Sequence, residues 1–192
     1  MDTPSSTKGC TVRRFHEGKS AAMGTGSVAR LVLTDASPLI GLAIVQGLGW
    51  LPPLFGAVWM LQEVEREVLT GTVARGEAEI GAAIEAGWLR VWSNPVPDVA
   101  LPDLDEGEAA CIRIALAHQT APGNQALLLM DERAGRAVAS EKQLGIAGTA
   151  AVIGMAKTRG LIPGARQVFE VLHRSDFRIS AEVIRTVLAR VE

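Results

Sequence analysis

Two aspartates each end a short apolar run, and acids placed in this way can hold a metal ion. Asp35 follows the run 31–34, and Asp131 follows the run 126–130. Short, nearly uninterrupted apolar runs are typical of strands buried on both faces of a parallel sheet. Open α/β sheets bind their ligands at the carboxyl ends of such strands. If the two strands are neighbours, both carboxylates enter one crevice, where a divalent cation held by carboxylates and waters would offset their repulsion.

Further acids could join this crevice, and each has a structural explanation beside the functional one. Asp105 and Glu108 open a strong helical pattern, and their spacing favours a helix cap, with Asp105 as the N-cap and Glu108 closing the first turn. The alternative turns Glu108 into the crevice as a ligand. Glu63 and Glu67 share one face of an earlier predicted helix, so spacing leaves open which of them would join the site, and a solvated face remains the default.

Two arginines, Arg133 and Arg136, follow Asp131 directly, and guanidinium forks suit phosphate oxygens. The charge distribution agrees with an anionic substrate. Residues 31–130 carry four Lys or Arg against twelve Asp or Glu, a balance of −8, and residues 131–192 carry ten against seven, a balance of +3. This division suits a polyanion that crosses metal-neutralised carboxylates with cations on its flanks, and it is equally compatible with ordinary solvated helix faces.

The elements that must position these residues alternate along the chain. Strands separated by helices imply βαβ units and a parallel sheet, so the predicted fold class is α/β. We predict strands over 31–35, 88–92, 126–131 and 145–147, a strand or turn over 54–59, and helices over 38–47, 62–69, 77–86, 105–118, 133–144, 149–159 (with Thr149 as its cap), 165–173 and 180–191.

Length and composition predict one domain behind an N-terminal extension. The 192 residues are 48% hydrophobic, which is enough for a proper core. Residues 1–30 lack apolar periodicity, and we predict that they form a disordered extension. The apolar stretch 39–51 is shorter than the ~20 residues of a membrane span, so we expect no membrane contact and a cytoplasmic location. Cys111 fits a core position, and the apolar region 39–61 leaves a homodimer open.

Seven segments in register resemble the PIN-like nucleases, in particular a bacterial subgroup of formerly unknown function that is related to VapC-type toxins. The resemblance runs from about Leu31 to the C-terminus. Its segments are Leu33–Ile40, Leu54–Val58, Val64–Val68, Leu104–Glu108, Asp131–Arg136, Gly148–Thr149 and Ala156–Ile162.

The resemblance implies a three-layer α/β/α fold with a central parallel sheet over residues 31–192. It implies that three or four acids hold Mg²⁺ or Mn²⁺ for phosphodiester cleavage. Relatives commonly carry proline where this chain has Leu61, which loosens the register of the helix that bears Glu67. Carried over residue by residue, the catalytic acids are Asp35, Glu67, Glu108 and Asp131, of which Asp35, Glu108 and Asp131 bind metal, and the small hydroxyl residues near the site are Ser37 and Thr149.

The first functional hypothesis is therefore a Mg²⁺- or Mn²⁺-dependent endoribonuclease, the toxin of a toxin–antitoxin pair. Its substrate would be RNA, contacted by Ser37, Thr149, Arg133 and Arg136, and a cognate antitoxin protein would mask the acids. The second hypothesis is a PIN-like module that binds protein or nucleic acid without catalysis. A third, a receiver-like phosphoacceptor, lacks the acid pair beside the first strand that such a protein needs.

Overall fold

The computed structural model describes residues 30–71, 76–101 and 104–192, and its centre is a five-stranded parallel sheet. The strand order is β3-β2-β1-β4-β5, so the two strands that precede Asp35 and Asp131 are neighbours at the centre. Their side chains are almost all buried, because helices cover both faces. The strands are β1 (Arg30–Thr34), β2 (Val58–Met60), β3 (Leu89–Val91), β4 (Gln125–Leu129) and β5 (Gly145–Ala147).

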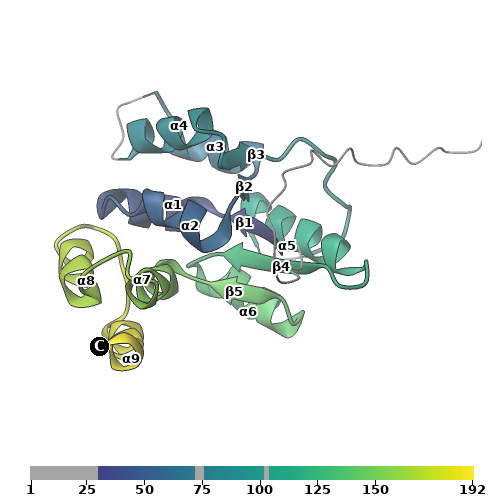
Figure 1. Cartoon of the computed structure of the whole chain (residues 1–192). Coiled ribbons are helices and arrows are strands. Elements are labelled where there is room, and N and C mark those ends of the chain that lie inside the picture. The colour runs from purple at the N-terminus through teal and green to yellow at the C-terminus, as the bar shows by residue number, and fades with distance from the viewer. Residues whose placement is uncertain (1–29, 72–75, 102–103) are drawn as a thin grey trace, which may run out of the picture.

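Helices cover both faces of this sheet and give a three-layer α/β/α fold (Figure 1). Helix α5 packs against β1 and β4, with α6 beside it, whereas α1, α2, α4 and α7 lie on the opposite face. The helices are α1 (Ala36–Ile44), η1 (Leu48–Trp50, a 3-10 turn), α2 (Leu51–Phe55), α3 (Gln62–Val68), α4 (Glu77–Glu85), α5 (Glu106–Gln119), α6 (Arg133–Glu141), α7 (Thr149–Thr158), α8 (Ala165–His173) and α9 (Ala181–Val191).

A second, smaller apolar core joins α7, α8 and α9 at the C-terminal end of the chain (Figure 1). Ile153 of α7 and Phe169 and Leu172 of α8 are buried in it, and α9 packs against α7 through partly buried residues. Helix α9 begins at Ser180, whose hydroxyl oxygen accepts a hydrogen bond from the Val183 N–H at 3.3 Å. This cap marks where α9 starts.

Most predicted elements are confirmed, and the main difference is α2. A strand or turn is predicted over 54–59, whereas the structure has α2 over Leu51–Phe55 and strand β2 only from Val58. Pro52 and Pro53 stand in the first turn of α2, where a missing N–H costs nothing and the fixed φ favours a helix. Of the predicted N-terminal extension, 1–29 lie outside the described residues, and Arg30 belongs to β1.

No single helix among the described residues has the length and apolar character of a membrane span. Helix α1 and the Leu48–Phe55 segment reach that length and composition together, but only across a bend of 110°.

Candidate active site

Asp35 lies at the carboxyl edge of the sheet, at the junction between β1 and α1. Its backbone N–H donates to the carbonyl oxygen of Leu129 at 3.0 Å, which extends the pairing of β1 with β4 by one step. The residue then serves as the N-cap of α1 with an extended backbone. Because strands and helix are packed around it, the Asp35 side chain is only 7% exposed. A carboxylate is thus held in a nearly dry position at the end of the central strand.

Burial raises the pKa of Asp35 from 3.8 to about 6. The negative charges of Asp105 and Glu67 raise this pKa further, whereas hydrogen bonds from the backbone N–H groups of Ala36 and Ser37 lower it. Within the described residues, the surroundings of Asp35 therefore disfavour its ionised form. A carboxyl group in this state gains stability from a proton or from a cation.

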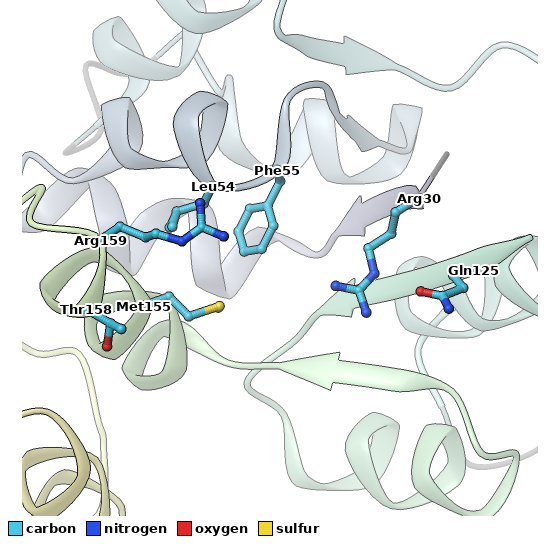
Figure 2. A pocket seen from close by; sticks show the side chains of 7 residues that line it. All are labelled: Arg30, Leu54, Phe55, Gln125, Met155, Thr158 and Arg159. Atoms are coloured by element: carbon cyan, nitrogen blue, oxygen red, sulfur yellow. The ribbon is translucent and has the colours of Figure 1, made fainter. Parts of the chain in front are cut away.

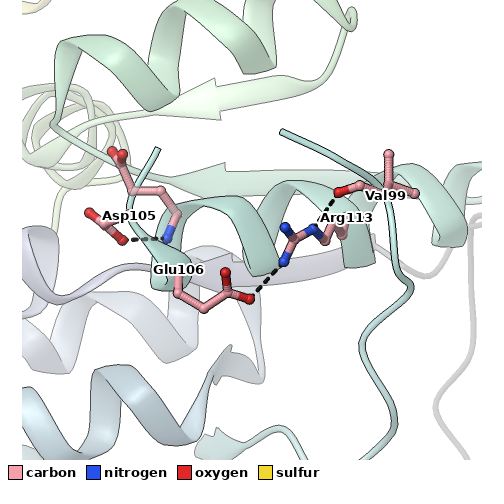
Figure 3. Close-up of polar contacts among 5 residues, drawn as sticks. Val99, Asp105, Glu106 and Arg113 are labelled. Carbon is pink, nitrogen blue, oxygen red and sulfur yellow. Dashed lines mark hydrogen bonds and ion pairs between the residues drawn. The ribbon is translucent and has the colours of Figure 1, made fainter. Parts of the chain in front are cut away.

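Glu108 enters the same region from the first turn of α5. Asp105 is the N-cap of this helix, as predicted, and its Oδ1 accepts the Glu108 N–H at 2.9 Å, the bond drawn in Figure 3. The Glu108 side chain, however, does not close the helix cap. It is 3% exposed, and its Oε1 has no hydrogen-bond partner among the described residues. A buried carboxylate oxygen without a partner is costly, so this atom is poised to accept a ligand.

The loop before α5 is held by a separate contact, also visible in Figure 3. Arg113 donates to the Val99 carbonyl oxygen at 2.7 Å and pairs with Glu106 at 2.7 Å. This contact ties the chain ahead of α5 to the helix and so steadies the turn that carries Asp105. Glu106 is therefore occupied with Arg113 on the outer side of the helix.

Burial also raises the pKa of Glu108, from 4.5 to about 7. The charges of Asp105, Asp35 and Glu132 contribute in the same direction, and the nearby Gly135 N–H, which forms no full hydrogen bond with Glu108 Oε1, opposes them. The Glu108 carboxylate lies so close to the backbone of α6 that position 135 has to be glycine. A Cβ there would lie 2.5 Å from Glu108 Oε1. Helix α6 can therefore pass close to the buried carboxylate only without a side chain at this position.

Asp131 follows β4 and is held differently from the other acids. The Thr149 N–H donates to its Oδ1 at 2.9 Å, and the Thr149 hydroxyl donates to its Oδ2 at 2.6 Å. These bonds and the charge of Arg136 lower the pKa of Asp131, but burial outweighs them, so its pKa is raised. Arg136 Nη1 donates to the Met130 carbonyl oxygen at 2.9 Å, which fixes this guanidinium beside Asp131.

Thr149 itself differs from its predicted role as a helix cap. Gly148 is the N-cap of α7, and Thr149 is the first residue of the helix. Its side chain is buried and faces Asp131 rather than its own helix. A Cβ at position 148 would lie 2.5 Å from Asp131 Oδ1, so Gly148 allows β5 and α7 to approach this carboxylate closely.

The two candidate acids on α3 have different neighbours. The charge of Glu67 acts on Asp35, whereas Glu63 pairs with Arg66 at 3.6 Å and its charge acts on the buried Cys111 thiol. Both acids therefore stay candidates for the helix acid of the site. Asp105 acts on both Asp35 and Glu108, although the sequence analysis gave it no role beyond the cap. Its spacing, three residues before Glu108 at the same helix end, could have identified it as part of the site.

Four carboxylates therefore gather around the end of β1, and we refer to Asp35, Glu67, Asp105 and Glu108 as the acidic cluster. Asp131 lies at the same edge of the sheet, next to the strand that bears Asp35, but both of its oxygens are bonded to Thr149 and the charge of Arg136 acts on it. Ser37 lies in the first turn of α1 and is half-buried, and its N–H faces Asp35. Arg133 is exposed at the start of α6.

The donor set of the acidic cluster fits a hard divalent cation. Oxygen ligands are those that Mg²⁺ and Mn²⁺ prefer, and the unpartnered Glu108 Oε1 is free to provide one. Within the described residues, no group of three or more His, Cys, Asp or Glu side chains is already arranged as a metal site. Mg²⁺ commonly takes one or two protein carboxylates and keeps several waters, so two ligands from this cluster would suffice.

A different cavity, of about 610 Å³, lies away from these acids and is shown in Figure 2. It opens at the amino ends of β1 and β4, where Arg30 and Gln125 are paired, and Phe55 and Arg159 point into it. The acidic cluster lies at the carboxyl ends of the same strands. We place the candidate site at the acids, because the carboxyl edge is where parallel sheets bind ligands and where the buried charged groups are.

The comparisons with known proteins agree with this geometry. A family model described as a PIN domain matches residues 31–192. A search of curated proteins gives no match. The matched range begins in β1 and runs through α9, so it contains every acid described above and Thr149. The chain therefore belongs to the PIN-domain family.

Proposed function

We propose that this protein is a Mg²⁺- or Mn²⁺-dependent endoribonuclease. PIN domains are generally nucleases, and the family match covers the whole fold. The observation that carries the proposal is the state of Asp35 and Glu108. Both are buried at the carboxyl edge of the sheet, both have a raised pKa, and Glu108 Oε1 has no partner within the described residues. Groups with strongly shifted pKa values in such a position are typical of catalytic sites.

The ligands that we propose for the cation are Asp35 and Glu108, with Asp131 at the neighbouring strand end. A divalent cation bound there supplies Lewis acidity and neutralises charge on the phosphoryl oxygens. Asp35 and Glu108 must be ionised to act as ligands, so at a pH near or below their pKa values each has to release a proton on binding. Glu67 and Asp105 add negative charge around these ligands and strengthen the attraction for a cation.

The residues around Asp131 then position the substrate. Thr149 fixes the orientation of the Asp131 carboxylate, and Arg136 is held beside it by the Met130 carbonyl oxygen. Arg133 lies one turn earlier on the same helix. Both guanidinium groups can bind phosphate oxygens of RNA, while the α1 residue Ser37 borders Asp35. An RNA strand would thus contact cations on one side of the site and the acidic cluster on the other.

The biological role that we propose is that of a cytoplasmic toxin whose antitoxin covers the acidic cluster. A basic segment of a partner protein would satisfy the same unbalanced negative charge as a metal ion, and it would block access to the site. A homodimer is compatible with this role, but the large apolar side chains of the region 39–61 are buried or half-buried within the fold and leave little apolar surface there for a second copy.

Cleavage of single-stranded RNA by the purified protein tests the proposal. We expect cleavage with Mg²⁺ or Mn²⁺ and none in a chelator, and we expect Asp35→Asn, Glu108→Gln and Asp131→Asn each to reduce the rate at least a hundredfold. Asp98→Asn, a matched change at an exposed position, should keep wild-type activity. Full cleavage by both Asp35→Asn and Glu108→Gln would refute the nuclease mechanism.

A second candidate is a PIN-like module that binds nucleic acid or protein without catalysis. The two hydrogen bonds from Thr149 to Asp131 favour it, because a carboxylate with both oxygens bonded can be purely structural. The same assay separates the two candidates. RNA that binds without metal-dependent cleavage would support the module.

A further inference from the structure

A cavity of about 450 Å³ lies beside Asp131, between α6, α7 and the start of α9. Arg133 and Arg136 line it from α6, and Arg178 lines it from the loop before α9. The function described so far uses Asp131 and the two α6 arginines, but it gives no role to Arg178 or to α9. The fold brings Arg178 to this place from more than forty residues further along the chain.

The lining of this cavity is cationic. It contains three arginines against one acid, Asp131. Arg133 and Arg178 are exposed, and neither has an ion-pair partner within 4.0 Å in the described parts of the chain. Arg136 is already oriented by its bond to the Met130 carbonyl oxygen. Guanidinium groups with free N–H donors around a hollow of this size are suited to a phosphate group.

The start of α9 adds a second favourable feature. This helix has eleven residues, and Ser180 and Val183 of its first turn line the cavity. The free N–H groups and the dipole at a helix N-terminus favour an anion. The remaining wall is apolar and includes Val187 of α9, and among the described residues no aromatic side chain lines the cavity. The cavity therefore suits a phosphate and its sugar, and it lacks a surface on which a base could stack.

The cavity at the opposite edge of the sheet serves as a comparison. It also contains two arginines, Arg30 and Arg159, but it lies at the C-terminal ends of α2 and α7. The partial negative charge at helix C-termini attracts cations, and Arg159, the C-cap of α7, already complements it. The cavity beside Asp131 is the better anion site of the two.

We propose that Arg178, together with Arg133, Arg136 and the N-terminus of α9, binds a backbone phosphate of an RNA strand, next to the phosphodiester held at the acids. This subsite rests on the proposed nuclease function, because Asp131 lines both the cavity and the catalytic edge. Arg178 is a substrate-binding residue in this arrangement, and it acts on affinity and on the path of the strand. Because the contacts reach phosphate and sugar, binding depends little on base identity.

Binding of a fluorescently labelled, single-stranded oligoribonucleotide of about eight nucleotides, measured by anisotropy in a chelator, tests the subsite. We expect Arg178→Ala to weaken binding about tenfold, and to reduce the slope of log K against log salt by about 0.7, the value for one phosphate contact on a single strand. Arg178→Lys should recover part of the affinity, because it keeps the charge but loses the fork. The matched control is Arg185→Ala, which removes an exposed arginine of α9 outside the cavity and should stay within twofold of wild type.

Cleavage by the same variants in Mg²⁺ separates this inference from the proposed function. A raised KM with a nearly unchanged kcat for Arg178→Ala supports the subsite. Equal RNA binding by Arg178→Ala and Arg185→Ala overturns it, even if the protein cleaves RNA, and so does a wild-type protein that binds no RNA. RNA binding that depends on Arg178 without any cleavage keeps the subsite and rejects the nuclease. Thermal unfolding of both variants confirms that the fold is retained.

Discussion

Thr149 binds both carboxylate oxygens of Asp131, with its N–H 2.9 Å from Oδ1 and its hydroxyl 2.6 Å from Oδ2. The contact joins the ends of β4 and β5, which are neighbours in the sheet, and Thr149 is fully buried. One residue thus fixes the orientation of the acid that we place between the acidic cluster and the cationic cavity.

Thr149→Val is expected to destabilise the protein by about 1–3 kcal/mol, because it leaves a partly buried carboxylate oxygen of Asp131 without its donor. Denaturant unfolding measures this loss. The matched control is Thr186→Val, which removes the hydroxyl that donates to the Glu182 carbonyl oxygen on the exposed side of α9, and its effect should stay within about 0.5 kcal/mol. Equal stability of the two variants would show that the Thr149 contact adds nothing.

The raised pKa of Asp35 predicts how stability depends on pH in the absence of metal. The folded protein releases this proton near pH 6, whereas the unfolded chain releases it near 3.8. Between these values the folded state binds more protons, so the free energy of unfolding falls as pH rises. One pKa unit is worth about 1.4 kcal/mol, so ionising Asp35 costs the fold on the order of 3 kcal/mol at neutral pH.

Asp35→Asn removes this titration, and unfolding measured from pH 4 to 8 in a chelator should show it. We expect the variant to be more stable than wild type above pH 7 and to have a shallower pH dependence, while it loses activity. Asp98→Asn should retain the wild-type profile. A wild-type slope in the Asp35→Asn protein would mean that Asp35 is not the group responsible.

Gly135→Ala should disturb the acidic cluster, although Gly135 is not one of its residues. The added Cβ would meet the Met130 sulfur and Glu108 Oε1, and both lie in packed surroundings, so we expect a loss of about 1–3 kcal/mol and reduced activity. Gly81→Ala on α4 is the control, since in the described parts of the chain no atom lies within 4 Å of its Cβ, and helix propensity then predicts a gain of up to about 1 kcal/mol. Effects of the same sign in both variants would contradict the close approach at Gly135.

Glu67→Gln should reduce RNA cleavage at least tenfold, whereas Glu63→Gln should leave it within twofold. The reason is that the Glu67 charge acts on Asp35, while Glu63 pairs with Arg66 on an exposed helix face. Steady-state cleavage rates at saturating Mg²⁺ measure the difference. A larger loss in Glu63→Gln than in Glu67→Gln would assign the α3 acid the other way.

The fold could be predicted because the patterns that indicate its strands and helices lie within short stretches of the sequence. The apolar runs ahead of Asp35 and Asp131 indicated two buried strands, and the helices between them implied a parallel sheet, which places both strand ends at one edge. Asp105 was correctly identified as a cap from its spacing to Glu108. Helix α2 was not predicted, because a proline pair can follow the end of one helix or stand in the first turn of the next.

The site could be predicted only in part, because its decisive contacts join distant segments. Thr149 resembled a helix cap in the sequence, and its bond to Asp131, eighteen residues earlier, depends on β4 and β5 being neighbours. The place of Arg178 in the cavity depends on how α9 packs against α7. The spacing of residues along the sequence cannot predict contacts between such distant segments.

Binding of Mn²⁺ to the metal-free protein, measured by calorimetry at pH 8, tests the central claim most directly. At this pH Asp35 and Glu108 are ionised in the folded protein, so proton release does not mask binding. We predict that wild type and Asp98→Asn bind Mn²⁺ with equal affinity, and that Asp35→Asn and Glu108→Gln each weaken it at least tenfold. Unchanged Mn²⁺ affinity in both site variants would contradict a metal centre built on the acidic cluster.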